Sequence, residues 1–178
     1  LLGIVKEKAA TVDLVVLGKR GENAIFDKDH LGSMLERVVR SVNKPCLVTN
    51  RAFSEMKQVA IAYDGSESCR KAIDYFVRQS GFHGMHFHVL SCVENHGEDV
   101  ASQRLSDVEA LFQAAGLQAN YQMLNGVVES SIAEYIQECE IDLLVLGAYG
   151  HSRIRELLIG STTTELLRSC HVPVFCFR

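Results

Sequence analysis

Two segments of this 178-residue chain are nearly identical, and their separation is the strongest constraint on its fold. Residues 12–18 (VDLVVLG) match residues 141–147 (IDLLVLG) almost residue for residue, 129 positions apart. Each copy continues to a second glycine, then to a Gly-Ser pair, and ends in a proline followed by a short apolar run. A period of about 130 residues is the size of a domain, whereas solenoid repeats recur every 20–50 residues or so. The repeat therefore predicts two related domains.

The landmarks of the repeat also place the domain boundaries. We expect residues 1–50 to be the C-terminal part of a first domain, residues 51–56 to be a linker and residues 57–178 to be a complete second domain. The chain opens without a methionine and in what reads as the middle of a helix, so we expect most of the first domain to be absent from it.

Apolar runs alternate with segments of helical spacing throughout residues 57–178. The expected helices are 67–79, 98–115, 128–139 and 162–168, and the expected strands are 59–63, 86–93, 118–124, 143–146 and 172–177. Alternation of this kind predicts parallel pairing, and nearly unbroken apolar strands are typical of sheets that are covered on both faces. We expect an α/β fold: a doubly wound, five-stranded parallel sheet with helices on both faces.

Composition narrows the class of protein. The net charge of −4 favours neither nucleic acid nor an anionic membrane as the partner. There is no apolar run of about 18 residues, so we expect no membrane-spanning helix. The six cysteines show no C-x-x-C spacing, and several lie within apolar runs, so we expect reduced core thiols in a cytoplasmic protein.

Ligands of doubly wound sheets bind beyond the carboxyl ends of the strands. The first expected strand ends at Asp64, the second near Cys92 and the fourth at a loop that contains Gly147 and Gly150. Further along, Gly160-Ser161-Thr162 opens a helix, where free N–H groups and the helix dipole favour an anion. These segments predict a phosphate-binding cradle.

The spacing Gly147-x2-Gly150-x9-Gly160-Ser161 resembles the nucleotide-binding signature of the universal stress protein (UspA) family. The segments VAIAYDGSE, DLLVLGAYGHS and HVPVFCFR are also similar to that family. The resemblance implies an adenine nucleotide alpha hydrolase-like sheet of order 3-2-1-4-5 and a regulatory role in the bacterial stress response. It further implies that ATP or AMP is bound, with or without Mg²⁺. The implied contacts are Asp64 to the nucleoside, backbone near Cys92 to adenine, and Gly147, Gly150, Gly160, Ser161 and Thr162 to the phosphates.

Other interpretations remain open at this point. The glycines could be required only for tight turns, and Ser161 could be only a helix N-cap. Asp64 could do no more than cap the turn in which it lies. His86 and His88 share one strand face, but no third metal ligand has a clear spacing. No Walker loop, dinucleotide fingerprint or nucleophile elbow occurs, so enzymatic activity is at most weak ATP hydrolysis. The rival function is a scaffold that binds no nucleotide and acts through dimer or protein contacts.

The first copy of the repeat departs from the signature. Ten residues, not nine, separate Gly21 from Gly32, and they include Asp27 and Asp29, which disfavour an anion. We therefore assign no nucleotide site to it. Each copy ends in an apolar segment, and apolar edges favour strand pairing. We expect residues 46–49 to pair with residues 174–177, either within one chain or in a homodimer.

Overall fold

The computed structural model describes residues 2–19, 33–50, 53–82, 84–93, 97–148 and 161–178. The elements of the first copy are α1 (Leu2–Ala9), β1 (Val15–Gly18), α2 (Ser33–Ser41) and β2 (Cys46–Thr49). The remainder comprises β3 (Gln58–Ala62), α3 (Glu67–Arg78), a 3-10 turn η1 (Ser80–Phe82), β4 (His86–Val93), α4 (Gly97–Ala114), β5 (Gln118–Asn125), α5 (Val128–Glu138), β6 (Leu143–Gly147), α6 (Ser161–Ser169) and β7 (Val174–Phe177).

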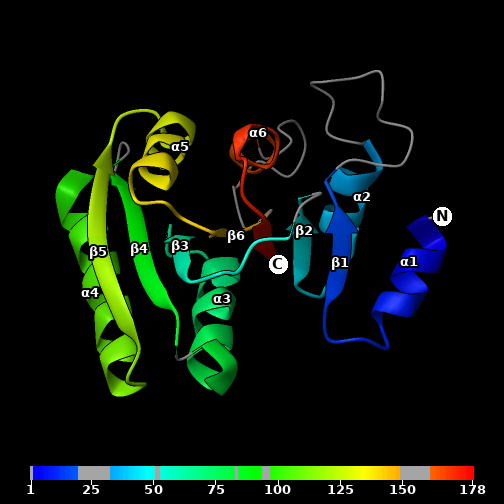
Figure 1. Cartoon of the computed structure of the whole chain (residues 1–178), viewed down its shortest axis with the longest axis horizontal. Coiled ribbons are helices and arrows are strands. Elements are labelled where there is room, and N and C mark those ends of the chain that lie inside the picture. Colours follow the sequence, from blue (N-terminus) through cyan, green and yellow to red (C-terminus); the bar gives the residue numbers. More distant parts are fainter. Residues whose placement is uncertain (1, 20–32, 51–52, 83, 94–96, 149–160) are drawn as a thin grey trace.

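The strands form one sheet in the order β1-β2-β7-β6-β3-β4-β5 (Figure 1). Every neighbouring pair is parallel except β2 and β7, which run antiparallel. Within residues 57–178 the sheet is a five-stranded, parallel, doubly wound α/β sheet, and its strands counted along the chain lie in the order 3-2-1-4-5. The whole sheet has seven strands because β1 and β2 join it at β7.

Two hydrophobic cores cover the two faces of the sheet. One core joins the sheet to α1, α2, α5 and α6, with Val38 and Ile132 among its buried members. The other joins the sheet to α3 and α4, with Ile73, Phe76 and Val108 among its buried members. Both copies of the repeat thus contribute to the first core, and the second core lies mainly under the helices of residues 57–178.

In the part of the chain that the structure describes, the two copies pair their strands in the same way. The amide of Val15 donates to the carbonyl oxygen of Pro45 at 3.0 Å, and the amide of Leu144 donates to the carbonyl oxygen of Pro173 at 3.0 Å. The predicted pairing of the two final strands is present within the single chain, in the register Cys46↔Cys176 and Leu47↔Phe175. The two copies are therefore joined edge to edge through hydrogen-bonded backbone.

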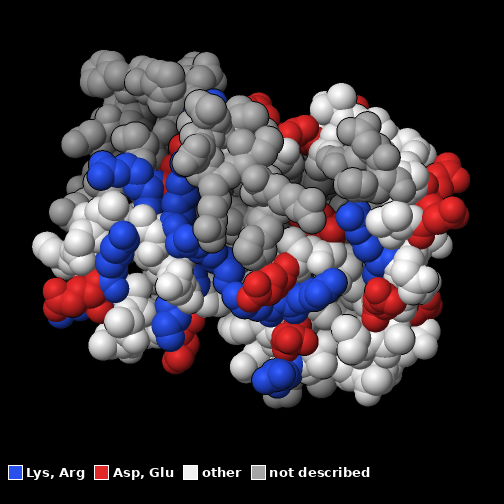
Figure 2. All heavy atoms as spheres, turned by 180° about the vertical axis from the view of Figure 1, so that it is seen from behind, with Lys and Arg blue, Asp and Glu red and all other residues white. Residues whose placement is uncertain are grey.

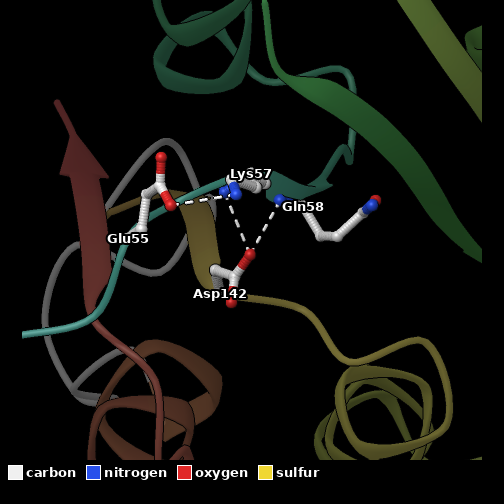
Figure 3. A network of polar contacts seen from close by, with 4 residues as sticks. All are labelled: Glu55, Lys57, Gln58 and Asp142. Atoms are coloured by element: carbon white, nitrogen blue, oxygen red, sulfur yellow. Dashed lines mark hydrogen bonds and ion pairs between the residues drawn. The ribbon is translucent and has the colours of Figure 1, made fainter.

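A carboxylate fixes the amino end of β3 against β6 (Figure 3). Asp142 Oδ2 accepts hydrogen bonds from the amides of Lys57 and Gln58, both at 2.9 Å. In return, the amide of Asp142 donates to the carbonyl oxygen of Gln58 at 2.8 Å. Glu55 adds an exposed ion pair with Lys57 at 2.9 Å. We call the two hydrogen bonds from Lys57 and Gln58 to Asp142 the Asp142 clamp.

Charges of both signs lie close together on the surface (Figure 2). One example is the ion pair between Lys71 and Glu67 at 3.0 Å. Lys71 also donates to the carbonyl oxygen of Arg178 at 3.3 Å, and the guanidinium of Arg178 donates to the carbonyl oxygen of Arg40. This chain of contacts links α3, the C-terminus and α2. Among the described helices, none is long and apolar enough to cross a bilayer.

Candidate functional site

A tight turn follows β3 at the carboxyl edge of the sheet. The amide of Tyr63 donates to the carbonyl oxygen of Leu90 at 2.8 Å, so the chain stays beside β4 for one residue after β3 ends. The exposed carboxylate of Asp64 then accepts the amide of Ser66 at 2.8 Å, the geometry of an Asx-turn. One carboxylate oxygen of Asp64 is therefore used to shape the turn, and its side chain remains at the surface.

Gly65 and Ser66 complete this turn and start α3. Gly65 has a φ of +78°, a left-handed conformation that glycine adopts without strain. Ser66 is the N-cap residue, and its hydroxyl accepts the amide of Cys69 at 3.3 Å. The local structure therefore accounts for each residue of the Asp-Gly-Ser sequence: Asp64 and Gly65 form the turn, and Ser66 caps α3.

Gly147, the last residue of β6, lies directly against the start of α3. A Cβ atom at this position would lie 2.6 Å from Sγ of Cys69, 3.0 Å from the Cys69 amide nitrogen and 3.2 Å from Oγ of Ser66. Any larger residue would push α3 away from β6. Because Gly147 has no side chain, the Asp64–Ser66 turn can lie directly beside the end of β6, where the glycine loop begins.

The Cys69 thiol fills the space between the turn and β6. It is buried, and its Sγ donates to the carbonyl oxygen of Ala62 at 3.3 Å. Burial, followed by the nearby charge of Asp64, raises the pKa of Cys69 to about 12. The group is therefore a neutral packing thiol and not a nucleophile.

The other predicted site residues lie near the same edge as far as the structure describes them. Cys92 is half-buried in β4, two residues beyond Leu90, which pairs with the end of β3. Helix α6 begins at Ser161, and Thr162 is half-buried in its first turn. Because β6 and β7 are parallel, α6 must return from the carboxyl edge, which places its N-terminus there. Gly150, Gly160 and the side chain of Ser161 lie outside the described residues.

Arg104 is a neighbour of the turn that the sequence did not indicate. A Cβ atom built on Gly65 would lie 3.3 Å from Nε of Arg104, so the guanidinium of this α4 residue covers the turn after β3. A cation here is suited to an anionic ligand at the carboxyl edge. No sequence motif marks Arg104, because its position depends on how α4 packs against β4 and β5.

The histidine pair in β4 belongs to a different part of the fold. His88 is buried, its Nδ1 lies 3.0 Å from the Tyr135 hydroxyl, and its Nε2 lies 2.9 Å from Oε1 of Gln58. Burial, and secondarily the charge of His86, lowers the pKa of His88 below its usual value. Both ring nitrogens are engaged, so His88 acts as a core polar contact between β4, β3 and α5. The described residues contain no group of three or more metal-binding side chains.

Comparison with known proteins identifies close sequence relatives. Residues 55–178 match the family model described as the universal stress protein family. The whole chain is 39% identical to universal stress protein Slr1230 of Synechocystis sp. over 178 residues, which are 62% of that protein. The chain therefore spans less than two thirds of this relative.

Solved structures show the same fold. A universal stress protein from Archaeoglobus fulgidus superposes with a TM-score of 0.79 at 21% identity, over 99% of this chain and 64% of that one. A universal stress protein in complex with cAMP superposes with a TM-score of 0.57 at 21% identity, over 70% of this chain and 99% of that one. An Arabidopsis thaliana universal stress protein family protein with AMP bound superposes with a TM-score of 0.55 at 14% identity, over 68% of this chain and 90% of that one. The match of the family model over residues 55–178 shows that the chain belongs to the universal stress protein family.

Proposed function

We propose that residues 57–178 bind an adenine nucleotide, ATP or AMP, at the carboxyl edge of the sheet, and that the bound nucleotide regulates partner binding in a stress response. The observation that carries this proposal is the contact of Gly147 with Cys69 and Ser66, because it joins the Asp64 turn to the start of the glycine loop. Family members with AMP and with cAMP support the class of ligand.

Each predicted residue has a role in this proposal. Asp64 has a second carboxylate oxygen for a ribose hydroxyl, and the backbone near Cys92 contacts adenine. Gly150, Gly160, Ser161 and Thr162 hold the phosphates at the N-terminus of α6, and Mg²⁺ accompanies ATP. Gly147 contributes its small size, which permits the approach of α3 and leaves the backbone accessible. Arg104 adds a positive charge beside the turn.

We further propose that residues 1–50 are the C-terminal part of a first domain of the same kind, joined by residues 51–56 to the second. The matching β1–β2 and β6–β7 pairs support this division. We place the protein in the cytoplasm, and we propose that its partners are the tandem domain or a second copy. Any hydrolysis of ATP would be slow.

Calorimetric titration with ATP and with AMP tests the proposal. The wild-type chain should bind at least one of them, and Gly150→Val should abolish binding because a valine side chain prevents close approach of the backbone. Gly21→Val is the matched control, since it makes the same change at the equivalent glycine of the first copy. Its binding should equal that of the wild type.

One result would favour the scaffold instead, and another would reject the proposed site. If neither nucleotide gives heat at millimolar concentration, the chain does not bind them. If Gly150→Val binds as tightly as Gly21→Val, the site lies elsewhere. Slow release of phosphate from ATP by the wild type, absent in Gly150→Val, would add weak hydrolysis to the proposed binding.

A further inference from the structure

Two cysteines face each other where the two copies of the repeat meet. Cys46 of β2 and Cys176 of β7 are directly opposite in the antiparallel register. Both are free thiols, and both are buried in the same hydrophobic core. We propose that Cys46 and Cys176 are a redox-sensitive pair, which a low-molecular-weight disulfide such as oxidised glutathione converts into a disulfide that joins the two copies covalently.

The backbone hydrogen bonds define the geometry of this pair. The carbonyl oxygen of Pro45 accepts an amide of β1, so the backbone groups of the next residue, Cys46, point to β7. The carbonyl oxygen of Pro173 accepts an amide of β6, so those of Cys176, three positions later, point to β2. The two cysteines therefore form a hydrogen-bonded pair, in which Cα atoms lie about 5.5 Å apart. A disulfide requires about 4.4–6.8 Å between Cα atoms, so the backbone separation suits the bond.

The bond between Cys46 and Cys176 would be a labile one. Cβ atoms of directly opposite residues lie about 4.5–5.5 Å apart, whereas those of a disulfide lie about 3.5–4.5 Å apart. The two side chains must therefore approach each other by roughly 1 Å, which stores strain in the native state. Strained disulfides are more easily reduced and are typical of regulatory sites. We therefore expect the bond to break again under reducing conditions.

The pair is unreactive while the two copies are in contact. Cys46 is 1% exposed and Cys176 is 2% exposed. Burial raises the pKa of Cys46 to about 11, and burial, followed by the nearby Cys46, raises the pKa of Cys176 above its usual range. Neutral thiols are poor nucleophiles, so oxidation requires that the β2–β7 contact opens first.

The β2–β7 contact is small enough to open locally. It comprises three registered residue pairs. Among the described elements, it is also the most extensive contact between residues 1–50 and residues 57–178. A contact of this size opens at a free energy below that of global unfolding. Separation of the copies exposes both thiols, and a disulfide formed when they meet again keeps the copies together.

Two exchange steps convert the thiols into the disulfide. In the first, the thiolate of one cysteine attacks a sulfur of oxidised glutathione, the S–S bond of glutathione breaks, and one reduced glutathione leaves. In the second, the thiolate of the other cysteine attacks the protein sulfur of this mixed disulfide, the Cys46–Cys176 bond forms, and a second reduced glutathione leaves. The two cysteine protons end on the two glutathione thiols. The two electrons lost by the cysteines reduce the glutathione disulfide.

Mass spectrometry of the oxidised chain tests the inference. The folded, full-length chain is held in a glutathione buffer that is mainly oxidised, is quenched with maleimide and is digested. Peptides linked through Cys46 and Cys176 should accumulate, and they should disappear in reduced glutathione. The two cysteines lie 130 positions apart, so the disulfide closes a long loop. After removal of glutathione, the midpoint of urea unfolding should be higher in the oxidised than in the reduced chain by about 1 M.

Two variants distinguish this pair from other buried thiols. Cys46→Ala should abolish both the linked peptides and the shift of the midpoint. Cys170→Ala is the matched control and should retain both, because Cys170 is 3% exposed in the same core but lies outside the described strands. Each variant is compared with its own reduced form, so the loss of packing at the substituted position cancels.

Four results would overturn the inference. The first is the absence of the linked peptides from the oxidised wild type, and the second is a linkage of Cys46 or Cys176 to Cys170. The third is a shift of the midpoint that persists in Cys46→Ala. The fourth is a disulfide-linked species of twice the chain mass, because it would place the bond between two molecules. Gly150→Val should form the same linked peptides as the wild type, since the inference does not depend on nucleotide binding.

Discussion

Replacing Gly147 by alanine should destabilise the fold at the site. The new Cβ would lie 2.6 Å from Sγ of Cys69, about 0.8 Å closer than ordinary van der Waals contact, and 3.0 Å from the Cys69 amide nitrogen. The backbone nitrogen cannot rotate away, so α3 must shift from β6. Overpacking of this kind costs about 1–3 kcal/mol. Urea unfolding at constant m-value measures the loss in the free energy of unfolding.

A double-mutant cycle isolates the contact that causes this loss. Cys69→Ala removes the nearest atom, so Gly147→Ala should cost less in that background, with a coupling of about 0.5–1.5 kcal/mol. The backbone contact remains, so the rescue should be partial. Gly18→Ala, at the exposed equivalent position, should change stability by less than about 0.5 kcal/mol. Additive effects, or a neutral Gly147→Ala, would refute the reasoning.

Three further predictions concern the Asp142 clamp, the buried histidine and the thiols. Asp142→Ala removes the acceptor of two amides and should cost about 1–2 kcal/mol in urea unfolding, whereas Asp13→Ala should cost less than about 0.5 kcal/mol. His88 has a pKa below its unfolded value, so the unfolded state binds its proton first and stability should fall as the pH drops from about 7 to 5. His88→Gln should flatten that fall, and an unchanged slope would contradict it. In native protein, maleimide should label half-buried Cys92 well before Cys69, as read by mass spectrometry; equal rates would contradict the burial of Cys69.

Much of the architecture could be predicted because it is local or repeated in the sequence. The run from Val59 to Tyr63 predicted β3 within one residue of its bounds, since a short apolar run between turns has few alternatives. The final strand was predicted from Val172 but begins at Val174, after a proline whose nitrogen cannot donate to a sheet. The pairing of β2 with β7 could be predicted because each copy ends in an apolar segment, and an unpaired apolar strand edge favours pairing with another strand.

Features that depend on tertiary contacts could not be predicted in this way. The sequence marked Gly147 as a phosphate-loop glycine, and the packing reason for it appeared only when Cys69 was placed beside it. Arg104 looked like any polar residue of an amphipathic helix until α4 brought it over Gly65. The sequence placed His88 beside His86 on one strand face without a third metal ligand, but it did not show that Tyr135 and Gln58, 47 and 30 positions away, engage both of its ring nitrogens.

The central claim is that an adenine nucleotide binds at the carboxyl edge of the second copy. Amide chemical shifts recorded during separate titrations with AMP and with ATP test both the binding and its location. The account predicts saturable shifts at Asp64, Ser66, Cys92 and Thr162 with at least one nucleotide, and unchanged shifts at Gln58 on the opposite edge. Saturable shifts centred on Gln58, or no saturable shifts with either nucleotide at millimolar concentration, would contradict it.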